Sequence, residues 1–142
     1  MKPTVNLPAL LPHGPSMVLL DSIESWNPRE IVCLTTSHIR QDNPLRCDEV
    51  LPVYAAIEYA AQAMAVHGAL TASGRARAGV LGGVRRFRAR IDRLDNIAAP
   101  LRIVASLRQG EPTAATYTFS IRTGADEIVS GQAAVFYAKE HQ

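Results

Sequence analysis

The sequence is poor in cysteine and carries no metal-binding pattern around the few cysteines it has. Its two cysteines, Cys33 and Cys47, lie far apart, and no second cysteine or histidine stands at ligand spacing from either. A disulfide framework needs more cysteines, and a zinc site needs them closer together. The sequence therefore predicts two reduced thiols and no metal site.

Long hydrophobic runs are also missing. No stretch approaches the length of a membrane span, and residues 1–6 lack the apolar core of a signal peptide. The composition, 47% hydrophobic and 20% charged, is that of a globular protein. We therefore expect one domain over residues 1–142, located in the cytoplasm, with no membrane partner.

Excess charge is small, but the cations are unevenly distributed. A net charge of +2 and 6% aromatic residues give no support for nucleic-acid binding. Seven of the fifteen Lys and Arg residues nevertheless fall within residues 75–93. There Arg86, Arg88 and Arg90 are expected on one strand face and Phe87 on the other. This face is either simply solvated or a docking patch for an acidic partner or a phosphate group.

Residues 52–70 are predicted to form the long helix of the chain. Apolar residues such as Ile57 and Met64 recur at three- and four-residue spacing, and the many alanines make the other positions nearly as apolar. Pro52 suits the first turn of a helix, and Gly68 weakens the last turn. A helix that is apolar nearly all round is expected to be buried.

One polar row interrupts this apolar helix. Tyr54, Glu58 and Gln62 recur at every fourth residue, so they share a helix face. An ionised carboxylate is costly to bury. Glu58 is therefore either a hydrogen-bonded structural residue, with Gln62 as a partner, or a catalytic acid or base. Tyr54 stands one turn from Glu58, where it either packs or donates a hydrogen bond.

Strand-forming residues precede and follow the helix. Two segments before it, 17–24 and 30–38, are rich in Val, Ile, Leu and Thr and predict a hairpin, and four more strands are predicted at 79–91, 101–109, 114–123 and 127–137. One long helix between two strands and four strands is an α+β arrangement in which a curled antiparallel sheet wraps a central helix. This arrangement matches the hot-dog fold. After the helix, sequence neighbours are expected to pair.

Three segments of the chain resemble one known family. The stretch 11–21, Leu-Pro-His-Gly-Pro-Ser-Met-Val-Leu-Leu-Asp, resembles an amino-terminal motif L-P-H-R-x-P-x-L-L-V-D, and residues 52–62 resemble a stretch ending in E-x-x-A-Q. Residues 79–87 resemble the strand that follows. The family is the 3-hydroxyacyl-[acyl-carrier-protein] dehydratases of fatty-acid synthesis, which are hot-dog proteins. The likeness runs in order through most of the chain.

The resemblance also implies where a catalytic pair belongs. In that family the helix carboxylate pairs with a histidine fourteen residues earlier, contributed by the other subunit of a dimer. Glu58 matches the carboxylate, but Pro44 stands in place of the histidine. His13, in the amino-terminal motif, is the candidate for the missing proton carrier. The backbone near Val53 and Tyr54 is the candidate hydrogen-bond donor to a thioester oxygen.

These departures resemble a divergent subgroup found in aryl polyene and xanthomonadin-type pigment clusters. The resemblance implies a homodimer, or a pair with a homologous hot-dog subunit, that eliminates water from a 3-hydroxyacyl group. The substrate would be held on the phosphopantetheine of acyl-carrier protein in fatty-acid, polyene or polyketide-type biosynthesis, without a metal or redox cofactor. Expected substrate-binding residues are Val53, Tyr54, Gln62, Arg86 and Arg88.

Two other functions stay open at this point. One is thioester hydrolysis, because Glu58 on this helix is equally suited to activating a water molecule. The other is a non-catalytic subunit that binds the carrier and stabilises an active homologue, which the proline at position 44 favours.

Overall fold

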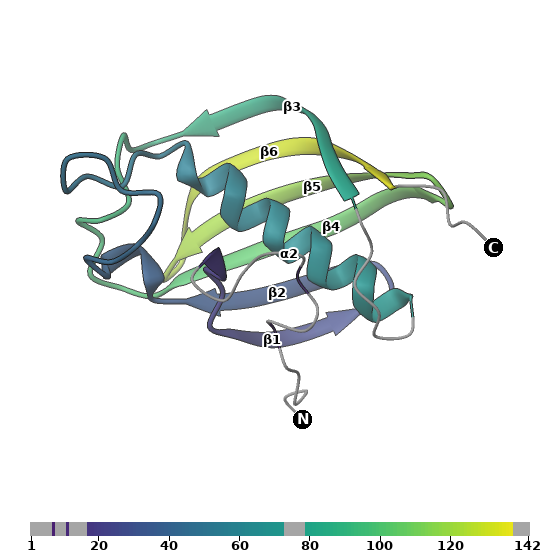
Figure 1. Cartoon of the computed structure of the whole chain (residues 1–142), viewed down its shortest axis with the longest axis horizontal. Helices are drawn as coiled ribbons and strands as arrows, with labels where there is room; N and C mark the ends of the chain where they lie inside the picture. Colours follow the sequence, from purple (N-terminus) through teal and green to yellow (C-terminus); the bar gives the residue numbers. More distant parts are fainter. Residues whose placement is uncertain (1–6, 8–10, 12–16, 73–78, 138–142) are drawn as a thin grey trace.

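A six-stranded antiparallel sheet curls around one long helix (Figure 1). The computed structural model describes residues 7, 11, 17–72 and 79–137. Its strands are β1 Ser22–Asn27, β2 Glu30–Thr35, β3 Gly79–Ala89, β4 Leu101–Glu111, β5 Ala114–Thr123 and β6 Asp126–Tyr137. Its helices are the 3-10 helix η2 Ser37–Ile39 and the α-helix α2 Ala55–Thr71. This is the α+β arrangement that the sequence predicts.

The strand order is β1-β2-β4-β5-β6-β3. As expected, β4, β5 and β6 pair with their sequence neighbours. The strand that directly follows the helix behaves differently, because β3 pairs with β6, with Val84 opposite Ala133. In the part of the chain that the structure describes, β1 and β3 are therefore the two edges of the sheet.

The first hairpin is shorter than predicted and displaced along the chain. Its first strand begins at Ser22 rather than at residue 17, because the preceding residues bond to other elements: Leu19 N–H donates to the Gln62 side chain and Leu19 C=O accepts from Thr35. The turn is also tighter than predicted. Asn27 Oδ1 accepts from the N–H groups of Arg29 and Glu30, at 2.8 and 3.0 Å, and closes an Asx turn.

Helix α2 begins three residues later than predicted and is buried along most of its length. Pro52 C=O accepts from Ala55 N–H at 2.9 Å, so the proline forms the turn that leads into the helix. Tyr59 and Met64 are essentially inaccessible to solvent and pack against the sheet. The helix also continues past Gly68. This glycine is explained by packing, since a Cβ there would lie 3.0 Å from the Tyr137 hydroxyl.

The arginine-rich strand keeps the predicted grouping of Arg86 with Arg88, but a bulge interrupts it. Arg85 is opposite Gln132 and Arg88 is opposite Ser130, so β3 spends three residues where β6 spends two. This is a β-bulge, and Arg86 adopts a left-handed φ of 54° within it. Arg86 and Arg88 line one pocket on the outer face of the sheet, as predicted, and the bulge adds Arg85 to that face; β3 ends at Ala89, so Arg90 lies outside the predicted row.

None of the helices within the described residues is both long and apolar enough to cross a membrane. The two cysteines are free thiols, Cys33 buried and Cys47 exposed. Burial raises the pKa of the Cys33 thiol to about 12, so it is protonated and unreactive at neutral pH.

Candidate active site

Glu58 lies in the first turn of α2, at the boundary between solvent and core. Along its row the exposure changes sharply: Tyr54 is 71% exposed, Glu58 is half-buried and Gln62 is fully buried. The composition of the helix predicts burial on all sides. The structure differs, because the amino-terminal end of the helix is open to solvent. A carboxylate at this boundary is accessible to a small substrate while one of its oxygens, Oε1, accepts a hydrogen bond from Gln62 Nε2 at 3.3 Å.

Gln62 joins three parts of the site. Its Oε1 accepts from Leu19 N–H at 2.8 Å, and its Nε2 donates to Met17 C=O at 2.7 Å as well as to Glu58. Both ends of the amide are thus engaged by protein groups, which does not favour the predicted substrate contact. The geometry instead makes Gln62 a positioning residue that orients Glu58 and fixes the amino-terminal segment on the helix.

His13 lies outside the described residues. The described residues on either side of it are firmly held: Leu11 and Leu19 belong to the hydrophobic core, at 4% and 0% exposure. Met17 is bonded to Gln62, one helical turn from Glu58. The amino-terminal motif and the helix motif found in the sequence are therefore neighbours in space.

The start of the helix offers one backbone donor. Val53 N–H already donates to Asp92 C=O at 3.0 Å, which corrects the donor role predicted for Val53. The N–H groups of Ala55 and Ala56 donate to Pro52 and Val53 carbonyls, both at 2.9 Å. Among the described residues, no hydrogen bond engages Tyr54 N–H, which also lies at the positive end of the helix dipole.

The side chain of Tyr54 forms a small aromatic surface beside the helix start. Its ring stacks on Phe87 of β3, with centroids 6.0 Å apart and an interplanar angle of 24°. Because Phe87 is in the β3 bulge, the edge of the sheet lies directly beside the open end of the helix. This surface is contiguous with Glu58, one turn further along.

The loop that carries Pro44 is fixed by a buried polar network that the sequence analysis missed. Asn43 is 4% exposed and donates through Nδ2 to Ser37 C=O at 2.9 Å and to the Tyr59 hydroxyl at 3.1 Å. The Ser37 and Tyr59 hydroxyls are 2.6 Å apart. Burial raises the pKa of Tyr59, so this network is neutral and structural. In the sequence, only the polar residues Ser37 and Asn43 between an apolar strand and an apolar helix indicate this network.

Two described histidines lie elsewhere in the core. His67 is fully buried, with Nδ1 2.7 Å from the Tyr117 hydroxyl and Nε2 donating to Asn27 C=O at 2.8 Å. His38 Nε2 is 2.9 Å from Ile97 C=O. Burial lowers the pKa of both rings. Both rings are fully buried and bonded to groups away from Glu58, so the structure does not pair either histidine with it.

Within the described ranges, no group of three His, Cys, Asp or Glu side chains is arranged to hold a metal ion. The chemistry that the site offers is therefore that of one partly exposed carboxylate, one amide donor at a helix start and an adjoining aromatic surface.

The family model of ApeP-like proteins, described as ApeP dehydratase, matches residues 5–142. The chain belongs to the ApeP-like family. This membership confirms the resemblance to the divergent, pigment-cluster dehydratases, and the protein is a dehydratase-like hot-dog protein. A comparison with curated protein sequences gave no significant match.

Solved structures support the fold. The dehydratase heterocomplex ApeI:P from Xenorhabdus doucetiae matches with a TM-score of 0.85 and 22% identity, over 97% of this chain and 94% of that one. AziG from S. sahachiroi matches with a TM-score of 0.63 and 12% identity, over 84% and 91%. A mutant thioesterase from Staphylococcus aureus matches with a TM-score of 0.64 and 11% identity, over 83% and 93%. The predicted hot-dog fold is thereby confirmed.

Proposed function

We propose that this ApeP-like protein acts on 3-hydroxyacyl thioesters of acyl-carrier protein and takes part in eliminating water from them. The observation that carries the proposal is the Glu58 carboxylate. It is accessible at the open end of α2, is oriented by Gln62, and lies one turn from the Tyr54 amide at the helix start. Membership of a family described as dehydratases supports the same reaction.

The proposed reaction needs a base, an acid and an oxyanion donor. The base removes a proton from C2, the C–H electron pair forms the C2–C3 double bond, and the C3–O bond breaks as the leaving oxygen takes up a proton and departs as water. Negative charge develops on the thioester oxygen, where Tyr54 N–H is the proposed donor. Glu58 and His13 are the proposed acid–base pair.

The support for His13 is chain length. It is four positions before Met17, whose carbonyl is bonded to Gln62, and four chain steps span at most about 14 Å. A histidine in this motif can thus be brought to the Glu58 side of the helix in the same subunit. This would replace the partner-subunit histidine that is missing at Pro44.

We further propose that the active assembly contains a homologous hot-dog subunit. The ApeI:P structure is described as a dehydratase heterocomplex. In this chain β3 is an edge strand with exposed Val80, and an unpaired strand edge favours pairing with a second sheet. The thioester would be presented by acyl-carrier protein, with Arg86 and Arg88 as proposed docking residues.

The test is formation of a 2-enoyl thioester from a 3-hydroxyacyl carrier substrate, followed by absorbance. Glu58→Gln keeps the shape and the hydrogen-bonding capacity of the side chain but cannot carry a proton, and we expect a loss of about 10²- to 10⁴-fold. His13→Ala should cause a similar loss. The control is His67→Gln, which changes a buried histidine outside the site and should leave the rate within about threefold once folding is verified.

Other results would select other functions. Release of free acid without an enoyl product would indicate thioester hydrolysis. A less than tenfold loss in Glu58→Gln would remove Glu58 from the chemistry. If the chain is inactive alone but raises the activity of a homologous subunit, and Glu58→Gln does so equally well, the chain is the non-catalytic partner that Pro44 favours.

A further inference from the structure

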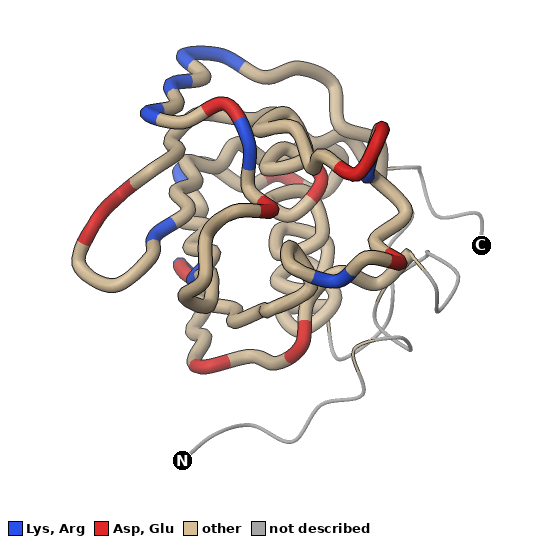
Figure 2. Tube along the Cα trace, turned by 90° about the vertical axis from the view of Figure 1, so that its left-hand side faces the viewer, with Lys and Arg blue, Asp and Glu red and all other residues tan. Residues whose placement is uncertain are grey.

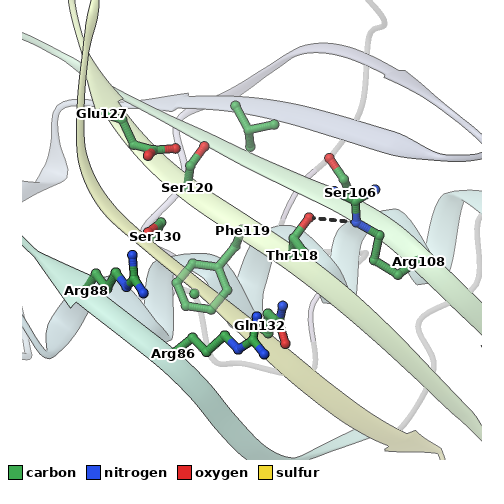
Figure 3. Close-up of a pocket in the computed structure, with 12 residues that line it drawn as sticks. Arg86, Arg88, Ser106, Arg108, Thr118, Phe119, Ser120, Glu127, Ser130 and Gln132 are labelled. Atoms are coloured by element: carbon green, nitrogen blue, oxygen red, sulfur yellow. Dashed lines mark hydrogen bonds between the residues drawn. The ribbon is translucent and has the colours of Figure 1, made fainter.

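The face of the sheet opposite α2 carries a groove with arginines on both sides. We call it the outer groove (Figure 3). Its volume is about 400 Å³, and a second hollow of about 730 Å³ shares Arg108, Thr118 and Gln132 with its lining. Arg86 and Arg88 come from β3 on one side and Arg108 from β4 on the other (Figure 3). Figure 2 shows the arginine-rich part of β3 as a blue stretch along the top of the molecule.

Each side of the outer groove is built on a β-bulge. In β3 the bulge lies between Arg85 and Arg88 and contains Arg86. In β4 it lies between Leu107 and Gln109, so Arg108 is the extra residue. A bulge changes the direction of the side chain that it carries. Two independent bulges thus bring arginine side chains to the same groove.

The charge of these arginines is not compensated locally. On the same sheet face, Arg102 forms a two-pronged ion pair with Glu24 at 2.9 Å, and Arg122 lies 3.7 Å from Glu127. By contrast, within the described residues no carboxylate forms an ion pair with the arginines of the groove: Arg85, Arg86, Arg88 and Arg108. The one carboxylate that lines the groove, Glu127, is the one paired with Arg122.

The lining of the outer groove is largely polar, and one end is apolar. Hydroxyl and amide side chains from β4, β5 and β6 form the floor: Ser106, Thr118, Ser120, Ser130 and Gln132. At the other end Phe136, 53% exposed, covers Gly82 so closely that a Cβ there would lie 2.1 Å from its ring. A ligand that fits this surface combines acidic groups with an apolar contact.

The dimensions favour a helix over a small anion. The arginine-bearing strands β3 and β4 are separated by three inter-strand spacings, which is about 14 Å. An α-helix with its side chains is about 10–12 Å across, so it can lie along the floor with carboxylates reaching the arginines on both sides. A single phosphate would reach only one side.

We propose that the outer groove docks an acidic amphipathic helix of the acyl-carrier protein. This inference rests on the proposed function, which supplies the partner. Position supports it: Phe87, between Arg86 and Arg88 in sequence, stacks on Tyr54 on the helix side of β3. The basic groove and the open end of α2 therefore lie on two sides of one short piece of an edge strand.

The experiment measures binding of an acyl-carrier protein prepared without its phosphopantetheine arm, so that binding cannot depend on the Glu58 site. Arg88→Glu with Arg108→Glu changes one residue on each side of the groove. The matched control, Arg29→Glu with Arg40→Glu, makes the same change in net charge at exposed positions outside the groove. At low salt we expect the groove variant to bind about tenfold or more weakly and the control to lose less than about threefold.

Equal weakening in both variants, or none in the groove variant, would overturn the docking proposal. Equal binding of an unrelated acidic protein would overturn it too, since the surface would then be unselective. The proposed reaction is tested separately with a 3-hydroxyacyl thioester of free pantetheine, which needs no docking. Glu58→Gln should fail to convert it but should bind the arm-free carrier protein like the unmodified chain, so failure of one proposal is distinguished from failure of the other.

Discussion

The two faces of the sheet treat polar groups in opposite ways. On the helix side, buried polar side chains bond to one another and to the backbone: Gln62 makes three hydrogen bonds, and Asn43 and Ser37 both bond to the Tyr59 hydroxyl. On the outer face, Arg88 and Arg108 stand at the surface with no ion-pair partner among the described residues. The difference separates groups that fix a structure from groups that are available to a partner.

The largest loss of stability is expected for a substitution of Gln62, on the helix side of the sheet. Gln62→Leu has a similar size but leaves Leu19 N–H and Met17 C=O without their partner in a buried place, so we expect a loss of about 2 kcal/mol or more in the free energy of unfolding. Urea denaturation measures it. Arg88→Ala on the outer face is the control and should stay within about 0.5 kcal/mol.

A loss in Gln62→Leu no greater than in the control would mean that the contacts of Gln62 do not hold the site. A measurement of activity distinguishes a role of Gln62 in orienting Glu58 from a role in stability alone. If Gln62 orients Glu58, the pH dependence of the rate should also change in Gln62→Leu well below its unfolding temperature.

The two buried histidines should make the stability of the protein depend on pH. Burial lowers the pKa of both His38 and His67 in the folded chain, whereas unfolded histidine titrates near pH 6.5. Below about pH 6.5 the unfolded chain binds more protons, so stability is complete above that pH and is lost as the pH falls. Each histidine contributes a slope of up to about 1.4 kcal/mol per pH unit.

The measurement is the free energy of unfolding between pH 7 and pH 5. His38→Gln removes one titrating group, so its slope should be about half that of the unmodified chain. An unchanged slope would show that His38 binds its proton equally well in the folded and unfolded states, which would contradict the lowered pKa. The outer-face variant Arg88→Ala should keep the full slope, because it removes no group that titrates in this range.

The smallest effect is expected for the ion pair of the outer face. Arg102 and Glu24 are only half-buried, so the coupling between them in a double-mutant cycle with Arg102→Ala and Glu24→Ala should be about 0.2–1 kcal/mol and should decrease in high salt. Thermal unfolding of the four proteins gives this value. A coupling above about 2 kcal/mol would place this pair with the buried, structural polar groups of the helix side.

Much of the fold follows from periodicity. The alternation of apolar residues in residues 114–123 and 127–137 predicts β5 and β6 nearly to the residue, because each buries one face. Helix α2 is predicted for the same reason. The start of β1 is not, because Leu19 is held by a side chain 43 residues away, a contact that no local pattern encodes.

The site is predicted less completely. The shared face of Tyr54, Glu58 and Gln62 follows from helix geometry, but their different exposures depend on what covers the helix. The engagement of Val53 by Asp92 depends on a tertiary contact. The presence of Arg85 on the same face as Arg86 and Arg88 could not be predicted, because the extra residue in β3 interrupts the strict alternation on which the prediction relied.

The hydrogen bond from Leu19 to Gln62 has a consequence for the order of folding. It joins residues 43 positions apart, so closing it costs chain entropy that local helix formation does not. The amino-terminal segment should therefore attach to α2 late in folding and detach early in unfolding. Glu58 would lose its oriented state in that step while the sheet is still intact, and the exchange rate of the Leu19 amide hydrogen would report when the site is assembled.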